Sequence, residues 1–235
     1  MATDLELSLR QVAELFEVSE STIVRWIQAE KLPVHDSHGV LSFHRVELLE
    51  WGTNHGKVSP WFFQSREGMS LGHATVSGAL DQGGVAHNVS GADRYEVFRA
   101  AVRDLPLPVT IDRDHLLDLL MAREKSGGTA IGHGIAIPHP RYPVVLPGGE
   151  SIMRACYLDR PLDYYVHDSQ PVDTLFLMIC PSISEHLHLL ARLAYVLQSE
   201  DFRNILKLRP DKLLLVTSVR AEEAKAKNDE ERQPT

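Results

Sequence analysis

The stretch REKSGGTAIGHGIAIPHPR, residues 123–141, decides how the larger part of this chain folds and works. It leads from the end of a predicted helix through glycines and a β-prone run, residues 131–137, to His139, which stands between Pro138 and Pro140. Each proline fixes its own φ and restricts the residue before it. We therefore expect the imidazole of His139 to be presented on a rigid backbone, as a nucleophile requires.

A histidine held in this way suits phosphoryl chemistry. Near pH 7 one ring nitrogen can attack phosphorus while the other holds a hydrogen bond that fixes the tautomer. Nearby cationic donors would balance the charge of the transferred group. The alternative is a zinc site built from His133, His139 and His186, but the sequence has no HExxH or similar ligand spacing and no obvious carboxylate partner. We therefore expect no metal and no cofactor.

The pattern on both sides, from residue 71 to residue 220, is that of a mixed α/β domain. We expect helices at residues 76–80, 94–105, 111–124 and 185–198, and strands at residues 84–89, 131–137, 151–157, 174–180 and 213–217. Residues 221–235 are charged and rich in Lys and Glu, so a frayed tail is expected there.

Three separated motifs carry a resemblance to a known family. They are Arg123-Glu124 with Gly128-Thr129, the run GIAIPH that ends at His139, and the strand DTLFLMIC with the helix EHLHLLARL downstream. In these motifs the segment resembles the EIIA domains of the phosphotransferase system of the fructose/mannitol type, including the PtsN-like nitrogen-regulatory members. The resemblance covers about residues 70–215 and implies an α/β fold with a mixed β-sheet flanked by helices.

The resemblance also implies roles for single residues. His139 would accept the phosphoryl group, and Arg123 and His186 would stabilise it, since a guanidinium fork and a second imidazole both suit phosphate oxygens. His188 follows two residues after His186 and would point away from it on a helix.

Two loop residues would support this site. Gly128 belongs to the turn, and Thr129 either donates its hydroxyl or simply closes the turn. The phosphoryl donor implied by the family is a phosphorylated HPr-like carrier protein, so the chain would be a phosphoryl carrier rather than a turnover enzyme.

The N-terminal part, residues 1–57, has a different pattern. The run LRQVAELFEVSESTIVRW, residues 9–26, predicts two short helices with Ser19 as the N-cap of the second, followed by a hairpin or wing at residues 34–43 and a closing helix. It resembles the winged helix-turn-helix of excisionase and MerR-type regulators. The exposed face of its second helix supplies the candidate DNA-binding residues, which are Ser19, Ser21, Thr22 and Arg25.

Charge argues against strong DNA binding by this segment alone. Residues 1–57 hold five basic and nine acidic side chains, a net charge of −4, which is half of the −8 of the whole chain. Neutralised phosphates dominate affinity for DNA, so a monomer should bind weakly. A homodimer or another partner would have to add affinity, and the alternative is a helix-turn-helix used for protein contacts.

Length and composition agree with two domains and a linker, residues 58–70, in 235 residues. The two cysteines, Cys156 and Cys180, lie in apolar stretches and are expected to be buried, reduced thiols. No signal peptide or membrane span is expected, which predicts a cytoplasmic protein.

These observations predict a regulator of the phosphotransferase system that couples phosphorylation of His139 to DNA binding or transcription. Two alternatives remain. One is an EIIA transport component that passes phosphate to an EIIB partner, and the other is an unphosphorylated protein-interaction platform.

Overall fold

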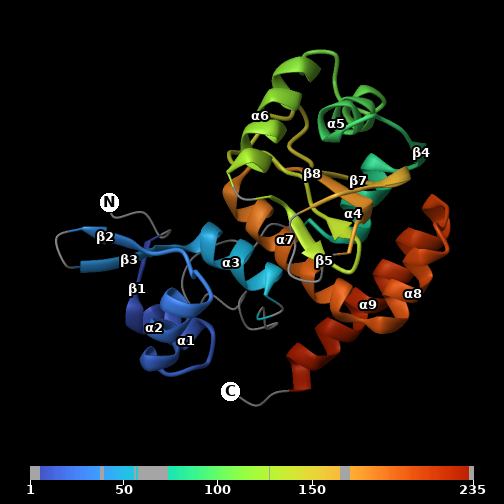
Figure 1. Ribbon diagram of the computed structural model, residues 1–235. Helices are drawn as coiled ribbons and strands as arrows, with labels where there is room; N and C mark the ends of the chain where they lie inside the picture. Colours follow the sequence, from blue (N-terminus) through green and yellow to red (C-terminus); the bar gives the residue numbers. More distant parts are fainter. Residues whose placement is uncertain are drawn as a thin grey trace. The chain divides into compact units, whose positions relative to one another are not determined.

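The computed structural model describes residues 6–37, 40–55, 57, 74–126, 128–164 and 170–232. The chain separates into two compact units, Met1–Met69 and Ser70–Thr235, which are coloured along the sequence in Figure 1. The predicted linker, residues 58–70, lies outside the described residues, and so do His38 and Gly39 of the predicted wing. Within the described ranges, no helix combines the length and apolar composition needed to cross a membrane.

Unit 1 is a helix-turn-helix with a small antiparallel sheet. Its elements are β1 (Glu6–Ser8), α1 (Leu9–Leu15), α2 (Glu20–Ala29), β2 (His35–Ser37), β3 (Val40–His44) and α3 (Arg45–Asn54). Strand β3 lies between β1 and β2 and is antiparallel to both. The two predicted helices, the hairpin and the closing helix are confirmed, whereas β1 has no counterpart among the predicted elements.

The turn between α1 and α2 has a backbone conformation that glycine prefers. Glu17 occupies it with a φ of 54°, which costs a residue with a side chain about 1–2 kcal/mol. Ser19 then caps α2, and its hydroxyl accepts the N–H of Thr22, as predicted. Because Val12 and Ile23 are fully buried beside this turn, core packing holds a turn that its own residue disfavours.

An aromatic cluster joins the ends of α1 and α2 to α3 in unit 1. The ring centroids of Phe16, Trp26 and Trp51 lie 5.3 to 6.0 Å apart. The Lys57 ammonium lies 5.1 Å from the Trp26 centroid and 2.7 Å from the Glu30 carboxylate. The cluster therefore fastens α3 and residue 57 to the end of α2.

Unit 2 is a mixed sheet covered by helices. Its elements are α4 (Val76–Gly83), β4 (Val85–Val89), α5 (Arg94–Arg103), α6 (Arg113–Lys125), β5 (Ala130–Gly132), β6 (Ile135–Ala136), β7 (Ile152–Leu162), β8 (Val172–Ile179), α7 (Ile183–Gln198), α8 (Glu200–Lys207) and α9 (Lys212–Arg232). The strand order is β4-β7-β8-β6-β5. Strand β4 is parallel to β7, and β6 is parallel to β8. Strand β7 is antiparallel to β8, and β5 is antiparallel to β6. The predicted α/β fold with a mixed sheet is confirmed.

Both faces of the central strands are buried, which explains their continuous apolar sequences. Cys156 on β7 pairs with Leu175 on β8, and both belong to the core that contains Phe98 of α5. The next residue of β7, Tyr157, points to the opposite face and is also fully buried. Figure 1 shows α5 and α6 on one side of the sheet and α7 on the other.

The two cysteines are buried, unpaired thiols, as predicted. Burial raises the pKa of Cys156 to about 12 and that of Cys180 to about 12. Both therefore stay protonated near neutral pH and pack as small apolar side chains.

Helix α9 corrects two predictions about the C-terminal end. The predicted strand at residues 213–217 is wrong, and residues 221–232, expected in a frayed tail, continue the helix to Arg232. Leu215, Val219 and Ala226 are buried at helical spacing. The short apolar run LLLV, residues 213–216, fits either a strand or a buried helix, so its pattern does not distinguish the two structures.

A side chain in the middle of α9 also caps another helix. The Glu223 carboxylate accepts the backbone N–H of Val76 at 2.7 Å and that of Ser77 at 3.3 Å. These N–H groups belong to the first turn of α4, where a helix has no backbone acceptors of its own. An acidic side chain at this position also complements the helix dipole.

We expect Glu223→Ala to lower the free energy of unfolding of unit 2 by about 1–2 kcal/mol, because two N–H groups of α4 lose their acceptor. Urea unfolding followed by far-UV circular dichroism measures the change. The matched control is Lys225→Ala on the same helix, where an exposed ion pair with Glu222 contributes little.

Tryptophan fluorescence separates the two units in this experiment, because all three tryptophans of the sequence precede residue 70. The fluorescence transition should stay unchanged in Glu223→Ala. Equal midpoints of Glu223→Ala and wild type in circular dichroism would contradict a capping role.

Candidate functional site

A short hairpin positions His139. Strands β5 and β6 are antiparallel, and the carbonyl of Gly134, between them, accepts the N–H groups of Asp173 and Thr174 at 2.9 and 3.1 Å. Gly134 has a φ of 75°, a conformation that side chains rarely adopt. Beyond β6, the Pro138 carbonyl accepts the N–H of Met178 at 2.9 Å. The segment of residues 134–138 is therefore hydrogen-bonded to β8 at both of its ends.

The His139 ring is buried and its tautomer is defined. The side chain is only 3% exposed, and its Nδ1 lies 2.7 Å from the carbonyl oxygen of Ile137. A carbonyl only accepts hydrogen bonds, so Nδ1 carries the proton and the lone pair of the neutral ring lies on Nε2. The arrangement suits Nε2 for nucleophilic attack.

A second imidazole stands beside the first. The ring centroids of His139 and His186 are 4.8 Å apart, with an angle of 62° between the ring planes. His186 is the fourth residue of α7, whose N-terminus is capped by Ser182. The positive end of this helix dipole favours negative charge nearby.

Arg123 is a buried cation at the end of α6. It is 7% exposed, and its Nη1 donates to the Gly128 carbonyl at 3.2 Å. The next carbonyl of the loop, that of Thr129, accepts the N–H of Ile137 at 2.9 Å. The loop that holds Arg123 is thus tied to the segment that leads to His139.

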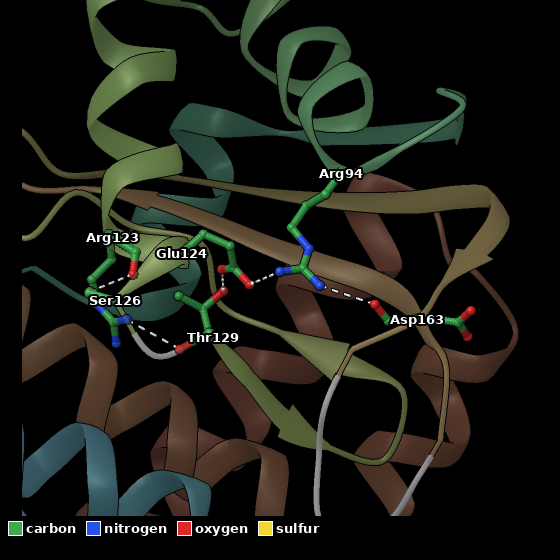
Figure 2. A network of polar contacts seen from close by, with 7 residues as sticks. Arg94, Arg123, Glu124, Ser126, Thr129 and Asp163 are labelled. Carbon is green, nitrogen blue, oxygen red and sulfur yellow. Dashed lines mark hydrogen bonds and ion pairs between the residues drawn. The ribbon is translucent and has the colours of Figure 1, made fainter.

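A network of polar contacts surrounds the loop (Figure 2). The buried Glu124 carboxylate accepts Arg94 Nη1 at 3.1 Å on Oε1 and the Thr129 hydroxyl at 2.6 Å on Oε2. The Thr129 hydroxyl therefore donates within the loop, to Glu124, and this contact closes the turn. Its neighbour Gly128 has a φ of 69°, and its N–H donates to the Glu124 carbonyl at 2.9 Å.

Three residues near the site were not singled out in the sequence analysis. Arg94 lies at the start of α5, and Ser151, before β7, donates its hydroxyl to the carboxylate of Glu185 on α7. These contacts join residues that lie about 30 positions apart in the sequence, so no sequence motif predicts them. The only local signal is that Glu185 follows the capping residue of α7 by three positions.

The other histidines considered lie elsewhere. His133 is exposed at the tip of the hairpin, with a φ of 55°. His188 is half-buried, and burial lowers its pKa from the ordinary value. Across the described part of the chain, no group of three or more His, Cys, Asp or Glu side chains could hold a metal ion.

The DNA-binding candidates gather at the start of α2. The Ser19 hydroxyl lies 2.8 Å from that of Ser21 and 3.0 Å from that of Thr22. Arg25 is exposed one turn further along the helix. The hydroxyls of Ser19, Ser21 and Thr22 therefore form one cluster, and the Arg25 side chain follows one helical turn later.

Comparisons with known proteins agree with this division. The chain matches the family model of the phosphoenolpyruvate-dependent sugar phosphotransferase system, EIIA 2, over residues 79–214. A helix-turn-helix domain model matches residues 6–55.

Several relatives of the chain are nitrogen regulatory proteins. It is 38% identical over 130 residues to that of Pseudomonas aeruginosa, covering 52% of this chain and 80% of the relative. It is 40% identical over 99 residues to that of Bradyrhizobium diazoefficiens, covering 41% of this chain and 62% of the relative.

A solved structure shares the fold. It is the nitrogen regulatory protein IIA-Ntr from Neisseria meningitidis, with a TM-score of 0.51 and 23% identity over 57% of this chain and 91% of that one. Because the EIIA 2 model spans more than half of the chain, the protein belongs to the EIIA 2 family of the phosphoenolpyruvate-dependent sugar phosphotransferase system, with a helix-turn-helix domain at its N-terminal side.

Proposed function

We propose that the protein accepts a phosphoryl group on Nε2 of His139 from a phosphorylated HPr-like carrier protein. One observation carries the proposal: in an EIIA 2 domain, the buried His139 ring holds its Nδ1 proton against the Ile137 carbonyl and faces the ring of His186. The domain would store or relay phosphate rather than turn over a small substrate.

The transfer needs no proton from outside the site. The Nε2 lone pair of His139 forms a bond to phosphorus, and the bond between phosphorus and the carrier breaks with its electron pair returning to the carrier. The Nδ1 proton stays in place, and the Ile137 carbonyl stabilises the positive charge that the ring gains.

Arg123 and His186 would hold the transferred group. Arg123 offers a planar, permanently charged fork that matches phosphate oxygens. His186 offers one further hydrogen bond, and the start of α7 adds its dipole. Buried donors are stronger than exposed ones, since little water competes with them.

The helix-turn-helix domain points to a regulatory use of the phosphoryl group. Phosphorylation adds about −1.5 to −2 charges for a hydroxyl ester, and a phosphohistidine should act similarly. Such a change at a protein surface can alter a partner contact. We therefore propose that phosphorylation of His139 regulates DNA binding by the N-terminal domain, supported by the helix-turn-helix match at residues 6–55.

The first test is phosphorylation with enzyme I, an HPr-like carrier and radiolabelled phosphoenolpyruvate. We expect acid-labile label on the wild type and none on His139→Ala. His133→Asn is the matched control, because it removes another histidine of the same hairpin while asparagine tolerates the positive φ of 55° there. Its labelling should equal that of the wild type.

The same assay separates the alternatives. Absence of label with any HPr-like donor would contradict the proposal and favour an interaction platform. Transfer of the label from this protein to an EIIB protein would instead favour a transport component.

A second prediction concerns the stabilising residues. We expect Arg123→Gln and His186→Asn each to slow labelling of His139 by about 10- to 1000-fold, because each removes a donor to the transferred group. Quenched-flow labelling at saturating carrier measures the rate. His188→Asn, two residues along α7 on another face, should label at the wild-type rate, and equal slowing in this control would refute the assignment of His186.

A third prediction concerns DNA. We expect weak retention of genomic fragments by the full chain at low salt, lost steeply as salt rises, because phosphate contacts dominate affinity. Arg25→Ala should weaken binding by about 1–3 kcal/mol if it contacts a base. Arg10→Ala on α1, where the side chain pairs with Glu14, is the control.

Gel shifts with phosphorylated and unphosphorylated protein test the coupling. No retention at low salt in either state would contradict a DNA-binding role and favour protein contacts.

A further inference from the structure

We infer that Arg94 is a positioning residue for phosphoryl transfer to His139, acting through the buried Glu124 carboxylate. The inference rests on the proposed phosphorylation of His139. It assigns a role to a residue 29 positions before Arg123 in the sequence, outside every motif that carries the family resemblance.

Arg94 joins three segments of unit 2 (Figure 2). Its Nη1 lies 3.1 Å from Glu124 Oε1 on α6, and its Nη2 donates to the Asp163 carbonyl at 3.0 Å. The guanidinium also lies over the ring of Tyr164, 4.0 Å from the ring centroid. Because Asp93 caps α5 immediately before it, the backbone from which Arg94 reaches is itself fixed.

The pairing with Glu124 is buried on the carboxylate side. The Glu124 side chain is 1% exposed, whereas the Arg94 side chain is 30% exposed. A buried carboxylate without a cation is strongly unfavourable. Arg94 thus supplies a positive charge to Glu124 while its own outer edge remains in contact with water.

From Glu124 a continuous chain of hydrogen bonds leads to the nucleophile. Thr129 donates its hydroxyl to Glu124 Oε2 at 2.6 Å, and its carbonyl accepts the N–H of Ile137 at 2.9 Å. The Ile137 carbonyl then accepts Nδ1–H of His139 at 2.7 Å. The side chain that fixes Thr129 therefore also fixes the carbonyl that sets the tautomer of His139.

A second branch leads from Glu124 to Arg123. The Glu124 carbonyl accepts the N–H of Gly128, and the Gly128 carbonyl accepts Nη1 of Arg123 at 3.2 Å. Loss of the loop geometry would thus displace the nucleophile and its cationic partner together.

Electrostatics give Arg94 a further effect on the reaction. The group transferred to His139 is an anion, and Glu124 adjoins Arg123 in sequence. Without Arg94, the Glu124 carboxylate would repel the incoming phosphoryl group and compete with it for the Arg123 guanidinium. By pairing with Glu124, Arg94 preserves the positive field of the site.

The test compares Arg94→Gln and Arg94→Lys with the wild type in the labelling assay. We expect Arg94→Gln to lower the maximal labelling rate about 10- to 100-fold, as misplaced reacting groups do, with an unchanged KM for the carrier. Arg94→Lys should be intermediate, since it keeps the charge but cannot reach both Glu124 and the Asp163 carbonyl. Arg103→Gln, at the exposed end of the same helix, is the matched control and should behave as the wild type.

A charge-neutral double variant distinguishes positioning from general damage. Replacing Glu124 by Gln in Arg94→Gln removes the unpaired buried charge and keeps an acceptor for Thr129, so we expect it to regain part of the lost rate. It also keeps the test decisive if Arg94→Gln alone fails to fold.

Imidazole ¹⁵N NMR gives a readout that does not depend on the carrier. In the wild type, the His139 signals should show a protonated Nδ1 in one tautomer, and in Arg94→Gln a mixture of the two tautomers. A wild-type rate and a wild-type spectrum in Arg94→Gln would overturn the inference. An unlabelled wild type would instead overturn the proposed function, while the spectra would still decide whether Arg94 positions His139.

Discussion

The buried carboxylate of Glu124 is the constraint around which the candidate site is arranged. A buried carboxylate needs hydrogen-bond donors for both of its oxygens. Arg94 of α5 and Thr129 of the loop after α6 supply them. Those partners fix the loop, and the loop fixes the base of the β5–β6 hairpin. The orientation of the His139 ring is therefore set by a charge that never touches it.

Much of this arrangement follows from local sequence. Helices α6 and α7 show apolar residues at helical spacing, and β8 is a run of apolar residues because both of its faces are covered. The stiffness of the backbone at His139 follows from its flanking prolines. The pairing of His139 with His186, 47 positions later, was accessible only through the family resemblance, because no spacing rule joins two such distant residues.

Other features depend on contacts that local patterns do not encode. Arg94 meets Glu124 across the α5–α6 packing, and a single arginine at the start of a helix gives no sign of its partner. The residues of α9 were misjudged for a related reason. Its leucine run suits a strand or a buried helix equally, and only its packing in unit 2 decides between them.

The helix-turn-helix domain shows tertiary packing overriding local preference. Its turn places Glu17 where glycine would be easier, and its second helix begins with hydroxyls that bond to one another. Those hydroxyls must exchange partners before they can contact a phosphate. Together with the net negative charge of residues 1–57, this lowers the affinity that the domain by itself can have for a phosphate backbone.

The hydrogen bonds from the start of α4 to Glu223 have a consequence for how this domain can be combined with other domains in one chain. These two hydrogen bonds join the first and last helices of unit 2. A domain whose ends are clasped in this way can be joined to new modules without disturbing its sheet. Joining a further module before α4 therefore leaves the core of the domain undisturbed.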